Sequence, residues 1–362
     1  MSKKTIQLDA ETYPVYIGAL TNGEFESLLT RKYVAAKKII FVDENTHGCC
    51  LEYLLTHFEA LGEAEVIMLP AGEEHKNIQI CMQVWEAMTE YRISRNDLAI
   101  CLGGGVVTDM GGFIASLYKR GIDFIHVPTS LLAMTDAAIG GKTGVDLANY
   151  KNLLGVFSTP KAVFIDPNFL ETLPVIDKVG GWMEMIKHGL IADALHFAEL
   201  KAVNFHEFSM PEEVIYRSLT IKNEIVKHDP FEKNIRKMLN FGHTFGHAAE
   251  SFFLENTEPV NHGIAVGMGM IIESYWSWRK GLLEESDLYE ICSVIIDKVG
   301  LPDLTGIPAE HFWMYMLNDK KNDRHEVRTV LLKAVGAAVY DEVVSFELLQ
   351  EGLEFYHRMN KE

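Results

Sequence analysis

Short apolar runs alternate with amphipathic segments through the first half of the chain. The runs KKIIFVDENT, AEVIMLP, DLAICL and DFIHVP are rich in β-branched residues and predict strands, the first of which ends at Val42. Helical spacing of apolar residues marks 49–61, about 77–91, and a stretch from the glycines at 103–105 to about Tyr118. This alternation predicts a parallel sheet that helices cover on both faces.

The pattern changes after FIDPNFLETLP, because a period of 3.6 residues dominates from Lys178 onward. Helices are predicted over 183–198, 211–226, 242–253, 263–279 and 285–299. Runs such as VRTVLL favour a strand but are too short to alter this pattern. We therefore predict two domains, an α/β domain with a parallel sheet over residues 1–175 and a mainly α-helical domain over 176–362.

The stretch LNFGHTFGHAAE carries two histidines, His243 and His247, four residues apart on a predicted helix. Residues at this spacing lie on the same helical face, so both imidazoles point into one volume. A third histidine, His262, follows in NHGIAVGMGM. Neutral imidazole is a good ligand for zinc and related divalent ions, and the three side chains are candidates for one metal site.

A chance pair on a solvated helix is the alternative, because the chain has 14 histidines. The pair does not form the H-E-x-x-H motif of zinc proteases, since Thr244 stands where that motif has its glutamate. A catalytic metal would therefore need a carboxylate from another segment. Glu184, in GGWMEMIKHG, is a candidate, with Lys187 one helical turn further on.

In a parallel sheet, ligands bind beyond the carboxyl ends of the strands. Asp43 follows the first predicted strand, Gly72 and Glu73 follow the second, and GGGVVTDMGG follows DLAICL. Consecutive glycines before a helix let backbone N–H groups approach a pyrophosphate. We therefore predict a dinucleotide ligand, although Thr108 stands where the third glycine of G-x-G-x-x-G would fall.

The run GGKT at 140–143 ends like an ATP-binding Walker A loop, but Asp136 takes the place of its first glycine. No clear strand precedes the run and no helix follows it, so an ATPase is not expected.

Residues 120–152 are rich in glycine and polar side chains and predict a loop over a cleft. Its Arg120, Asp136, Lys142 and Lys151 would face that cleft, unless they are ordinary solvated loop charges. Further cations flank the candidate metal-binding segments, namely Lys187, Lys222 and Arg236. Phosphate and carboxylate are the groups that such a set holds. We expect the active site to lie between the two domains.

The charge balance narrows the set of partners. Acidic residues outnumber basic ones by 51 to 33, so the net charge of -18 repels nucleic acid and anionic membrane surfaces. The N-terminal MSKKTIQLDAETY lacks the apolar core of a signal peptide, and no later apolar run approaches the ~20 residues of a membrane span. The five cysteines form no C-x-x-C pair. A cytoplasmic protein with reduced thiols is predicted.

The motifs, taken in order, resemble those of the 3-dehydroquinate synthase family, a branch of the sugar phosphate cyclases. The resemblance covers most of the chain through GGGVVTDMGGF, KRGI, VPTSLL, D-x-x-x-GGKTGV, KNLLG, PNFLETLP, E-x-x-KHG, LNFGHTFGHA-x-E, HG-x-AV-x-x-GM and DKK. It implies a Rossmann-like N-terminal domain that binds NAD and an α-helical C-terminal domain that binds a divalent metal, zinc or cobalt. It also implies a small phosphorylated sugar-acid substrate and a homodimer.

The resemblance assigns roles to individual residues. The implied metal ligands are Glu184, His243 and His262, with His247 beside them as a proton acceptor. The implied ligands of the substrate hydroxyls and carboxylate are Asp136, Lys187, Lys222, Arg236 and Asn240. The implied phosphate ligands are Lys142, Lys151, Asn152 and Arg120, the last from the same or the other subunit. One lysine of the pair Lys320 and Lys321 completes this set.

The implied NAD-binding residues follow the predicted strands. They are Asp43, Asn45, Glu73, Lys76, Gly104, Gly105, Val106, Asp109, Thr129, Ser130 and 169–172, which includes Phe169 and Thr172, with Lys142 and Lys151 nearby. An acidic group after a strand suits the ribose diol, so Asp43 is reached by both lines of reasoning.

The implied reaction converts 3-deoxy-D-arabino-heptulosonate 7-phosphate into 3-dehydroquinate and phosphate, a lyase step of the shikimate pathway. A substrate hydroxyl is oxidised transiently, and the ketone acidifies the neighbouring C–H so that phosphate can leave. The hydride then returns, the ring opens, and an intramolecular aldol step closes the carbocycle.

Other functions stay open. Ser130, Ala137, Ala138, Tyr150 and Ile264 depart from the family pattern, and cyclases of other sugar phosphates share the scaffold. A metal-dependent NAD polyol dehydrogenase shares the two-domain plan but does not need so many cations for a phosphate. A non-catalytic protein that binds a nucleotide is a further alternative. Such a protein would not need residues for a metal, for hydride transfer and for a phosphate all in one chain.

Overall fold

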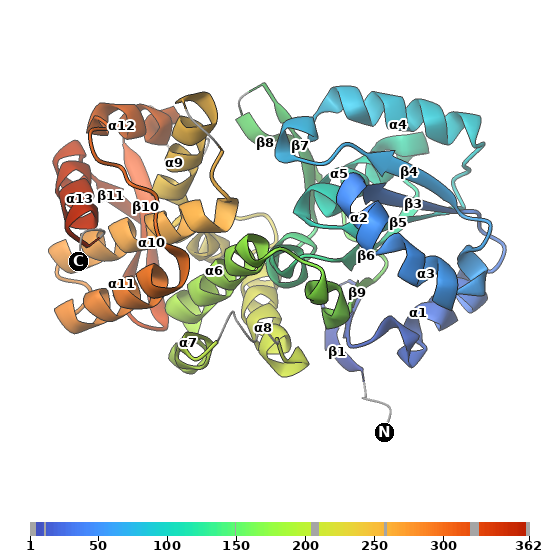
Figure 1. The fold of residues 1–362 in the computed structure, drawn as a ribbon, viewed down its shortest axis with the longest axis horizontal. Coiled ribbons are helices and arrows are strands. Elements are labelled where there is room, and N and C mark those ends of the chain that lie inside the picture. The colour runs from blue at the N-terminus through green and yellow to red at the C-terminus, as the bar shows by residue number, and fades with distance from the viewer. Residues whose placement is uncertain are drawn as a thin grey trace. The chain divides into compact units, whose positions relative to one another are not determined.

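The chain folds into two compact units in this computed structural model (Figure 1). The structure describes residues 5–10, 12–148, 150–203, 210–256, 259–318 and 326–359. The first unit contains Met1–Pro174 together with Met210–Leu219, and the second contains Val175–Ser209 and Thr220–Glu362.

A seven-stranded sheet forms the centre of the first unit, in the order β1-β2-β9-β6-β5-β3-β4. The strands are β1 (Ile6–Asp9), β2 (Pro14–Ile17), β3 (Lys38–Asp43), β4 (Glu65–Leu69), β5 (Leu98–Gly103), β6 (Asp123–Pro128) and β9 (Val163–Ile165). All neighbours pair in parallel except β1 and β2, which the apolar pattern did not predict. The predicted parallel sheet is confirmed.

Helices cover both faces of this sheet, as the alternation predicted. They are α1 (Glu24–Ser27), α2 (Glu44–Cys49), α3 (Leu51–His57), α4 (Ile78–Glu90) and α5 (Gly105–Leu117). The helices α4 and α5 pack on the face that carries Phe41, Cys101 and Phe124 (Figure 1). On the other face, Phe25 of α1 packs edge-on against Phe164 of β9. The helix predicted over 49–61 is divided at Phe58, because α3 ends at His57 and a 3₁₀ helix, η3 (Glu59–Leu61), follows.

A β-hairpin occupies part of the region for which we predicted a loop over a cleft. Its strands are β7 (Lys142–Leu147) and β8 (Tyr150–Phe157), which pair antiparallel. Two glycines face each other in this pairing, and a Cβ at Gly144 would lie 2.7 Å from the carbonyl oxygen of Leu154. The loop prediction is therefore wrong for these residues, because glycines needed for close strand pairing look like loop residues in a sequence.

The second unit is mainly helical, as predicted. Its helices are α6 (Val175–Ala192), α7 (Ala194–Lys201), most of α8 (Glu212–His228), α9 (His243–Asn256), α10 (His262–Arg279), α11 (Glu285–Val299), α12 (Ala309–Asn318) and α13 (Phe346–Met359). The helix predicted over 183–198 is divided by Asp193, whose carboxylate accepts from the amides of Leu195 and His196 and starts α7. The run VRTVLL lies in β10 (Val327–Ala334), which pairs with β11 (Ala337–Val344).

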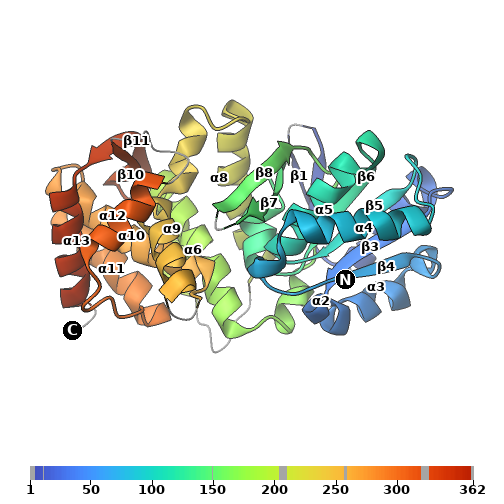
Figure 2. The ribbon, with the colours of Figure 1, turned by 90° about the horizontal axis from the view of Figure 1, so that it is seen from above.

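Helix α10 lies at the centre of this unit and contacts α6, α9, α11, α13 and β10 (Figure 2). Residues 263–277 of α10 are all buried, which explains why its apolar positions show so weak a periodicity. None of the helices in the described ranges is both long enough and apolar enough to cross a bilayer.

Candidate metal centre and active site

Glu184 projects from the middle of α6 and is completely buried. Its Oε2 accepts a hydrogen bond from Lys187, one turn further along the helix and also buried. Its Oε1 has no hydrogen-bond donor among the described residues. A buried carboxylate oxygen without a donor is costly, so the site calls for a cation at this atom.

His243 is the first residue of α9, directly after a turn at Gly242. Its Nδ1 lies 3.1 Å from the carbonyl oxygen of Phe241. A carbonyl can only accept, so Nδ1 carries the proton and Nε2 presents its lone pair. That Nε2 lies 3.6 Å from Glu184 Oε1.

His262 begins α10 and has a similar arrangement. Its Nδ1 lies 3.1 Å from Oε2 of the buried Glu250, and its Nε2 lies 3.7 Å from Glu184 Oε1. The preceding Asn261 caps the helix by accepting from the amide of Gly263. The Glu250 carboxylate therefore orients the imidazole so that its unprotonated nitrogen faces Glu184, an arrangement typical of metal-binding histidines.

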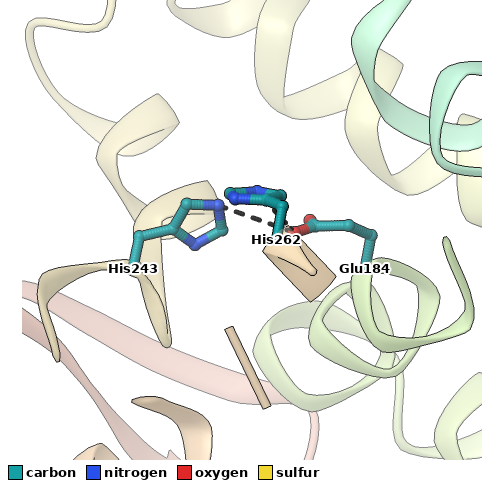
Figure 3. A group of neighbouring side chains, drawn as sticks. All are labelled: Glu184, His243 and His262. Carbon is teal, nitrogen blue, oxygen red and sulfur yellow. Dashed lines mark ion pairs between the residues drawn. The ribbon is translucent and has the colours of Figure 1, made fainter. Parts of the chain in front are cut away.

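The three side chains converge from three helices (Figure 3), and their ligand atoms lie within 4.8 Å of one another. Bonds of ~2.0–2.1 Å at tetrahedral angles would place such atoms about 3.3 Å apart. The observed separations of 3.6 and 3.7 Å are only slightly longer. Two lone pairs and a carboxylate oxygen facing one point fit a divalent metal, and three protein ligands leave a coordination position open for a substrate.

His247 lies one turn after His243, with ring centroids 5.3 Å apart. Its ligand atoms group with Glu250 and His262 and not with Glu184. The structure thus distinguishes the two histidines that spacing alone could not rank, and places His247 next to the three candidate metal ligands.

Three further predicted residues lie on other elements of the second unit. Lys222 is buried on α8, and Arg236 and Asn240 lie on a 3₁₀ helix, η9 (Ile235–Asn240). The Asp229 carboxylate accepts from the amides of Lys233, Asn234 and Arg236 and shapes the turn that leads into η9. Asn240 donates to Oε1 of Glu232 at 2.7 Å. Lys320 and Lys321 lie outside the described residues.

The predicted NAD-binding residues of the first unit lie at the carboxyl edge of its parallel sheet. Asp43 ends β3, Gly104 follows β5, Thr129 follows β6, and Phe169 lies shortly after β9. The strands β5 and β3 are neighbours, while β4 lies on the other side of β3, so the order reverses between β3 and β5. Dinucleotides bind at such a reversal. The first turn of α5 begins there at Gly105, and Gly104 gives it no side-chain cap, so its first amides have no partner within the helix.

The other predicted NAD-binding residues lie on several elements of the first unit. Asn45 lies in α2, and Glu73 begins the 3₁₀ helix η4 (Glu73–His75). Val106 and Asp109 lie in the first turns of α5, Ser130 follows Thr129, and Thr172 follows the 3₁₀ helix η7 (Pro167–Glu171).

Asp43 also caps α2, because its Oδ1 accepts from the amide of Thr46 at 2.7 Å.

An ion-pair network around the buried Lys76 joins three of these residues. Lys76 Nζ lies 2.7 Å from Asp109 Oδ2 and 3.5 Å from Glu73 Oε1. Burial by itself lowers the pKa of Lys76, but the carboxylates of Asp109 and Glu73 outweigh burial and raise the pKa above its usual value. The lysine is therefore charged and fixes η4 to α5.

The predicted phosphate ligands of the first unit are spread along the β7–β8 hairpin and beyond it. Lys142 begins β7 and pairs with Phe157, whereas Lys151 and Asn152 follow the turn at the other end. The register separates the backbones of Lys142 and Asn152 by on the order of 15 Å. Arg120, exposed and with a φ of 68°, precedes β6, and Asp136 lies in the π-helical turn η6 (Ala133–Ala137). The structure therefore does not place the backbones of Lys142 and Asn152 side by side.

Reasoning from the sequence assigned no role to Glu250, Asn261 or Asp229. Glu250 lies seven residues after His243, so helical periodicity placed both on one face and would have identified it. The sequence NHG at 261–263 is also a recognisable helix start. Nothing in the sequence signals that Asp229 binds three amides, because that depends on the fold of the turn.

Family models match both halves of the chain. The model for the N-terminal part of 3-dehydroquinate synthase matches residues 66–178, and the model for the C-terminal part matches residues 181–322. A 3-dehydroquinate synthase from Parabacteroides distasonis is 38% identical over 88% of this chain and 91% of its own length.

Two solved sugar phosphate cyclases share the fold. The 2-epi-5-epi-valiolone synthase of Streptomyces hygroscopicus, solved with NAD+ and Zn2+, has a TM-score of 0.85 at 26% identity and covers 98% of this chain and 99% of its own. A 2-deoxy-scyllo-inosose synthase complexed with carbaglucose-6-phosphate, NAD+ and Co2+ has a TM-score of 0.82 at 26% identity and covers 97% of this chain and 99% of its own. The fold is thus that of a sugar phosphate cyclase. Within that class, the chain belongs to the 3-dehydroquinate synthase family.

Proposed function

We propose that this chain converts 3-deoxy-D-arabino-heptulosonate 7-phosphate into 3-dehydroquinate and phosphate, using NAD and a divalent metal. One observation carries the proposal: the convergence of Glu184, His243 and His262 occurs in a chain that both 3-dehydroquinate synthase models match. The lower identity to the valiolone and inosose synthases makes those cyclases the weaker alternative.

The metal would be held by Glu184 Oε1 and by the Nε2 atoms of His243 and His262. When bound, such an ion polarises substrate oxygens, and NAD supplies a hydride acceptor that returns the hydride later. Lys187 donates to Oε2 of Glu184 and so leaves Oε1 facing the two histidines. The ligand geometry thus exists before the substrate arrives, which lowers the cost of ordering it.

His247 is the proposed proton acceptor beside the metal. Its ring is part exposed and lies against the rings of His243 and His262, with centroids 5.3 and 6.1 Å away. A neutral imidazole there can take a proton from a substrate hydroxyl near neutral pH. Lys222, Arg236 and Asn240 are proposed to bind the substrate hydroxyls and carboxylate, with Asp136 on the first unit.

Lys142, Lys151, Asn152 and Arg120 are proposed to hold the phosphate, whose departure needs cations at the leaving oxygen. NAD would bind at the carboxyl edge of the sheet, with its pyrophosphate at the start of α5 and a ribose at Asp43. Lys76 would keep Glu73 and Asp109 in place there.

We also propose a homodimer, formed through the β7–β8 hairpin. Leu147, Leu153 and Phe157 of this hairpin are between 42% and 53% exposed, so three large apolar side chains along it are open to solvent. Arg120 would then serve the partner's phosphate site. A cytoplasmic location is proposed because all five cysteines are free thiols.

Incubation of the protein with the heptulosonate phosphate and a catalytic amount of NAD tests the reaction. We expect equal amounts of free phosphate and 3-dehydroquinate, no net NADH, and loss of turnover with a chelator. Accumulation of NADH without phosphate would instead identify a polyol dehydrogenase. Turnover of another sugar phosphate but not of this one would identify a different cyclase.

A further inference from the structure

The N-terminus of α9, which carries His243, is capped by a carboxylate from another helix. The first amides of an α-helix have no partner within the helix, and here the preceding residue, Gly242, has no side chain to bind them. Glu273, on α10, accepts from the amides of Gly242 at 2.8 Å, Thr244 at 3.0 Å and Phe245 at 3.2 Å.

Glu273 is completely buried in α10, among apolar side chains. An uncompensated carboxylate in such surroundings is very costly. Three backbone donors, together with the positive end of the α9 dipole, satisfy its oxygens. A buried carboxylate of this kind holds its donors firmly, because letting any of them go would leave a buried polar oxygen with fewer partners.

Close backbone contact between α9 and α10 fixes where Glu273 can reach. A Cβ at Gly269 would lie 1.8 Å from the carbonyl oxygen of Gly242, and Gly242 has a φ of 80°. A side chain would not fit at Gly269, and glycine adopts the φ of Gly242 most readily. The two glycines together let the turn before α9 lie directly on α10. Glu273 follows Gly269 by one helical turn and therefore lies directly below the amides that it binds.

The amides that Glu273 binds lie around His243 in the chain. Two of the three bound amides, those of Gly242 and Thr244, are its direct neighbours in the chain, and its Nδ1 donates to the carbonyl of Phe241 in the same turn. A shift of this turn would move Nε2 away from Glu184 Oε1. His262 begins the helix that carries Glu273, about 16 Å away along its axis. Helix α10 therefore provides one proposed metal ligand itself and holds a second one in place.

We infer that Glu273 is a positioning residue for the metal centre, which sets the place of His243 relative to Glu184 and His262. The inference rests on the proposed metal site, to which Glu273 makes no direct contact. Its competing explanation is that Glu273 only stabilises the fold, as any helix cap does. Metal affinity separates the two, because a cap with a purely structural role does not change it in a protein that is still folded.

The test uses Glu273→Met, which keeps the size of the side chain and removes the acceptor, and Glu273→Gln, which keeps one oxygen. Ser277→Ala is the matched control. Ser277 is buried on the same helix one turn further on and accepts from the amide of Leu332, but it does not bind the turn at His243. The full chain is freed of metal and titrated with Co2+ against a competing chelator, and the visible spectrum of the cobalt protein and the thermal unfolding of the metal-free protein are recorded.

We expect Glu273→Met to weaken cobalt binding by ~10–100-fold, as the loss of residues that orient metal ligands does, and to alter the cobalt spectrum. Glu273→Gln should lower the cobalt affinity about tenfold, because its one remaining oxygen can still accept from the amides of Thr244 and Phe245 but not from that of Gly242. Ser277→Ala should unfold at a lower temperature and bind cobalt like the wild type.

Cobalt affinities within twofold of wild type in both Glu273 variants would overturn the inference, as would an equal loss in Ser277→Ala. If Glu273→Met does not fold by circular dichroism, Glu273→Gln decides by the same criterion. Failure of the wild-type chain itself to bind cobalt would instead contradict the proposed metal site, and the inference would fall with it.

Discussion

Two groups of proposed ligands are held in different ways. Glu184, His243 and His262 are each fixed by a second group, respectively Lys187, the carbonyl of Phe241 and Glu250. Lys142 and Asn152 of the β7–β8 hairpin are exposed, and the register sets their backbones far apart. The proposed metal ligands are thus preorganised. The proposed phosphate ligands would have to be ordered when the substrate binds, at about 0.5–1.5 kcal/mol for each immobilised side chain.

The difference suits the roles that we propose. A metal ion bound throughout turnover requires fixed ligands, since any freedom lowers its affinity. Phosphate has to enter with the substrate and leave as a product, so its ligands need to release it. Variants of the proposed metal ligands should therefore lower the metal affinity, whereas variants of the proposed phosphate ligands should weaken substrate binding.

His243→Ala should have the largest effect, because it removes a ligand and not merely a group that orients one. We expect cobalt affinity to fall by more than the ~100-fold upper range seen for orienting residues, and activity to be lost. Titration with Co2+ measures this. His228→Ala, which removes an exposed histidine on α8, is the control and should bind like the wild type. Unchanged affinity in His243→Ala would refute the ligand assignment.

Lys142→Ala should spare metal binding and raise KM for the phosphorylated substrate by ~10–100-fold, the equivalent of one charge-assisted hydrogen bond of about 1.5–3 kcal/mol. Steady-state kinetics by phosphate release is the measurement. The exposed Lys161, which pairs with Asp123, provides the control variant Lys161→Ala. Weaker cobalt binding in Lys142→Ala would show that the two groups of ligands are not separate.

Glu250→Gln should weaken cobalt binding by about tenfold, because the amide oxygen can still accept from His262 Nδ1 but carries no charge. Glu250→Leu should lower the cobalt affinity further, because it leaves no acceptor for His262 Nδ1. The comparison with Glu255→Gln on the same helix, whose carboxylate instead accepts from Tyr315, controls for the change of charge. A Glu250→Gln affinity equal to that of wild type would mean that His262 needs no orienting group.

Asp146→Ala should have the smallest effect. The Asp146 carboxylate accepts from the amide of Asn152 at 2.6 Å and holds that residue at a φ of 51°, a strained backbone conformation. Losing this bond costs about 1 kcal/mol, so KM should rise roughly fivefold. Asp146→Asn keeps an acceptor and should behave like the wild type. An unchanged KM in Asp146→Ala would show that the position of Asn152 does not matter for the substrate.

Much of the fold could be predicted because its periodicities are strong. The buried strands β3, β5 and β6 are apolar runs between polar segments, and such runs are typical of parallel sheets. The hairpin β7–β8 could not be predicted, since its glycines and lysines are also typical of loops. The strands β1 and β2 are only four residues long each and show no clear pattern.

The site was predictable as a set of residue types but not as a geometry. Spacing did not distinguish His243 from His247 as a metal ligand. The turn at Gly242 directs the side chain of His243 toward Glu184. Glu273 was detectable as a lone acid in the apolar stretch GMGMIIESYW, where a buried charge requires a partner. Its partners are backbone amides 28 to 31 residues away, which no side-chain pattern encodes.

Anomalous diffraction from crystals of the cobalt-loaded protein tests the central claim most directly. We predict one strong peak per chain, ~2.0–2.2 Å from Glu184 Oε1 and from the Nε2 atoms of His243 and His262. A peak bound by His247 and Glu250 in place of Glu184, or no peak near these side chains, would contradict the account.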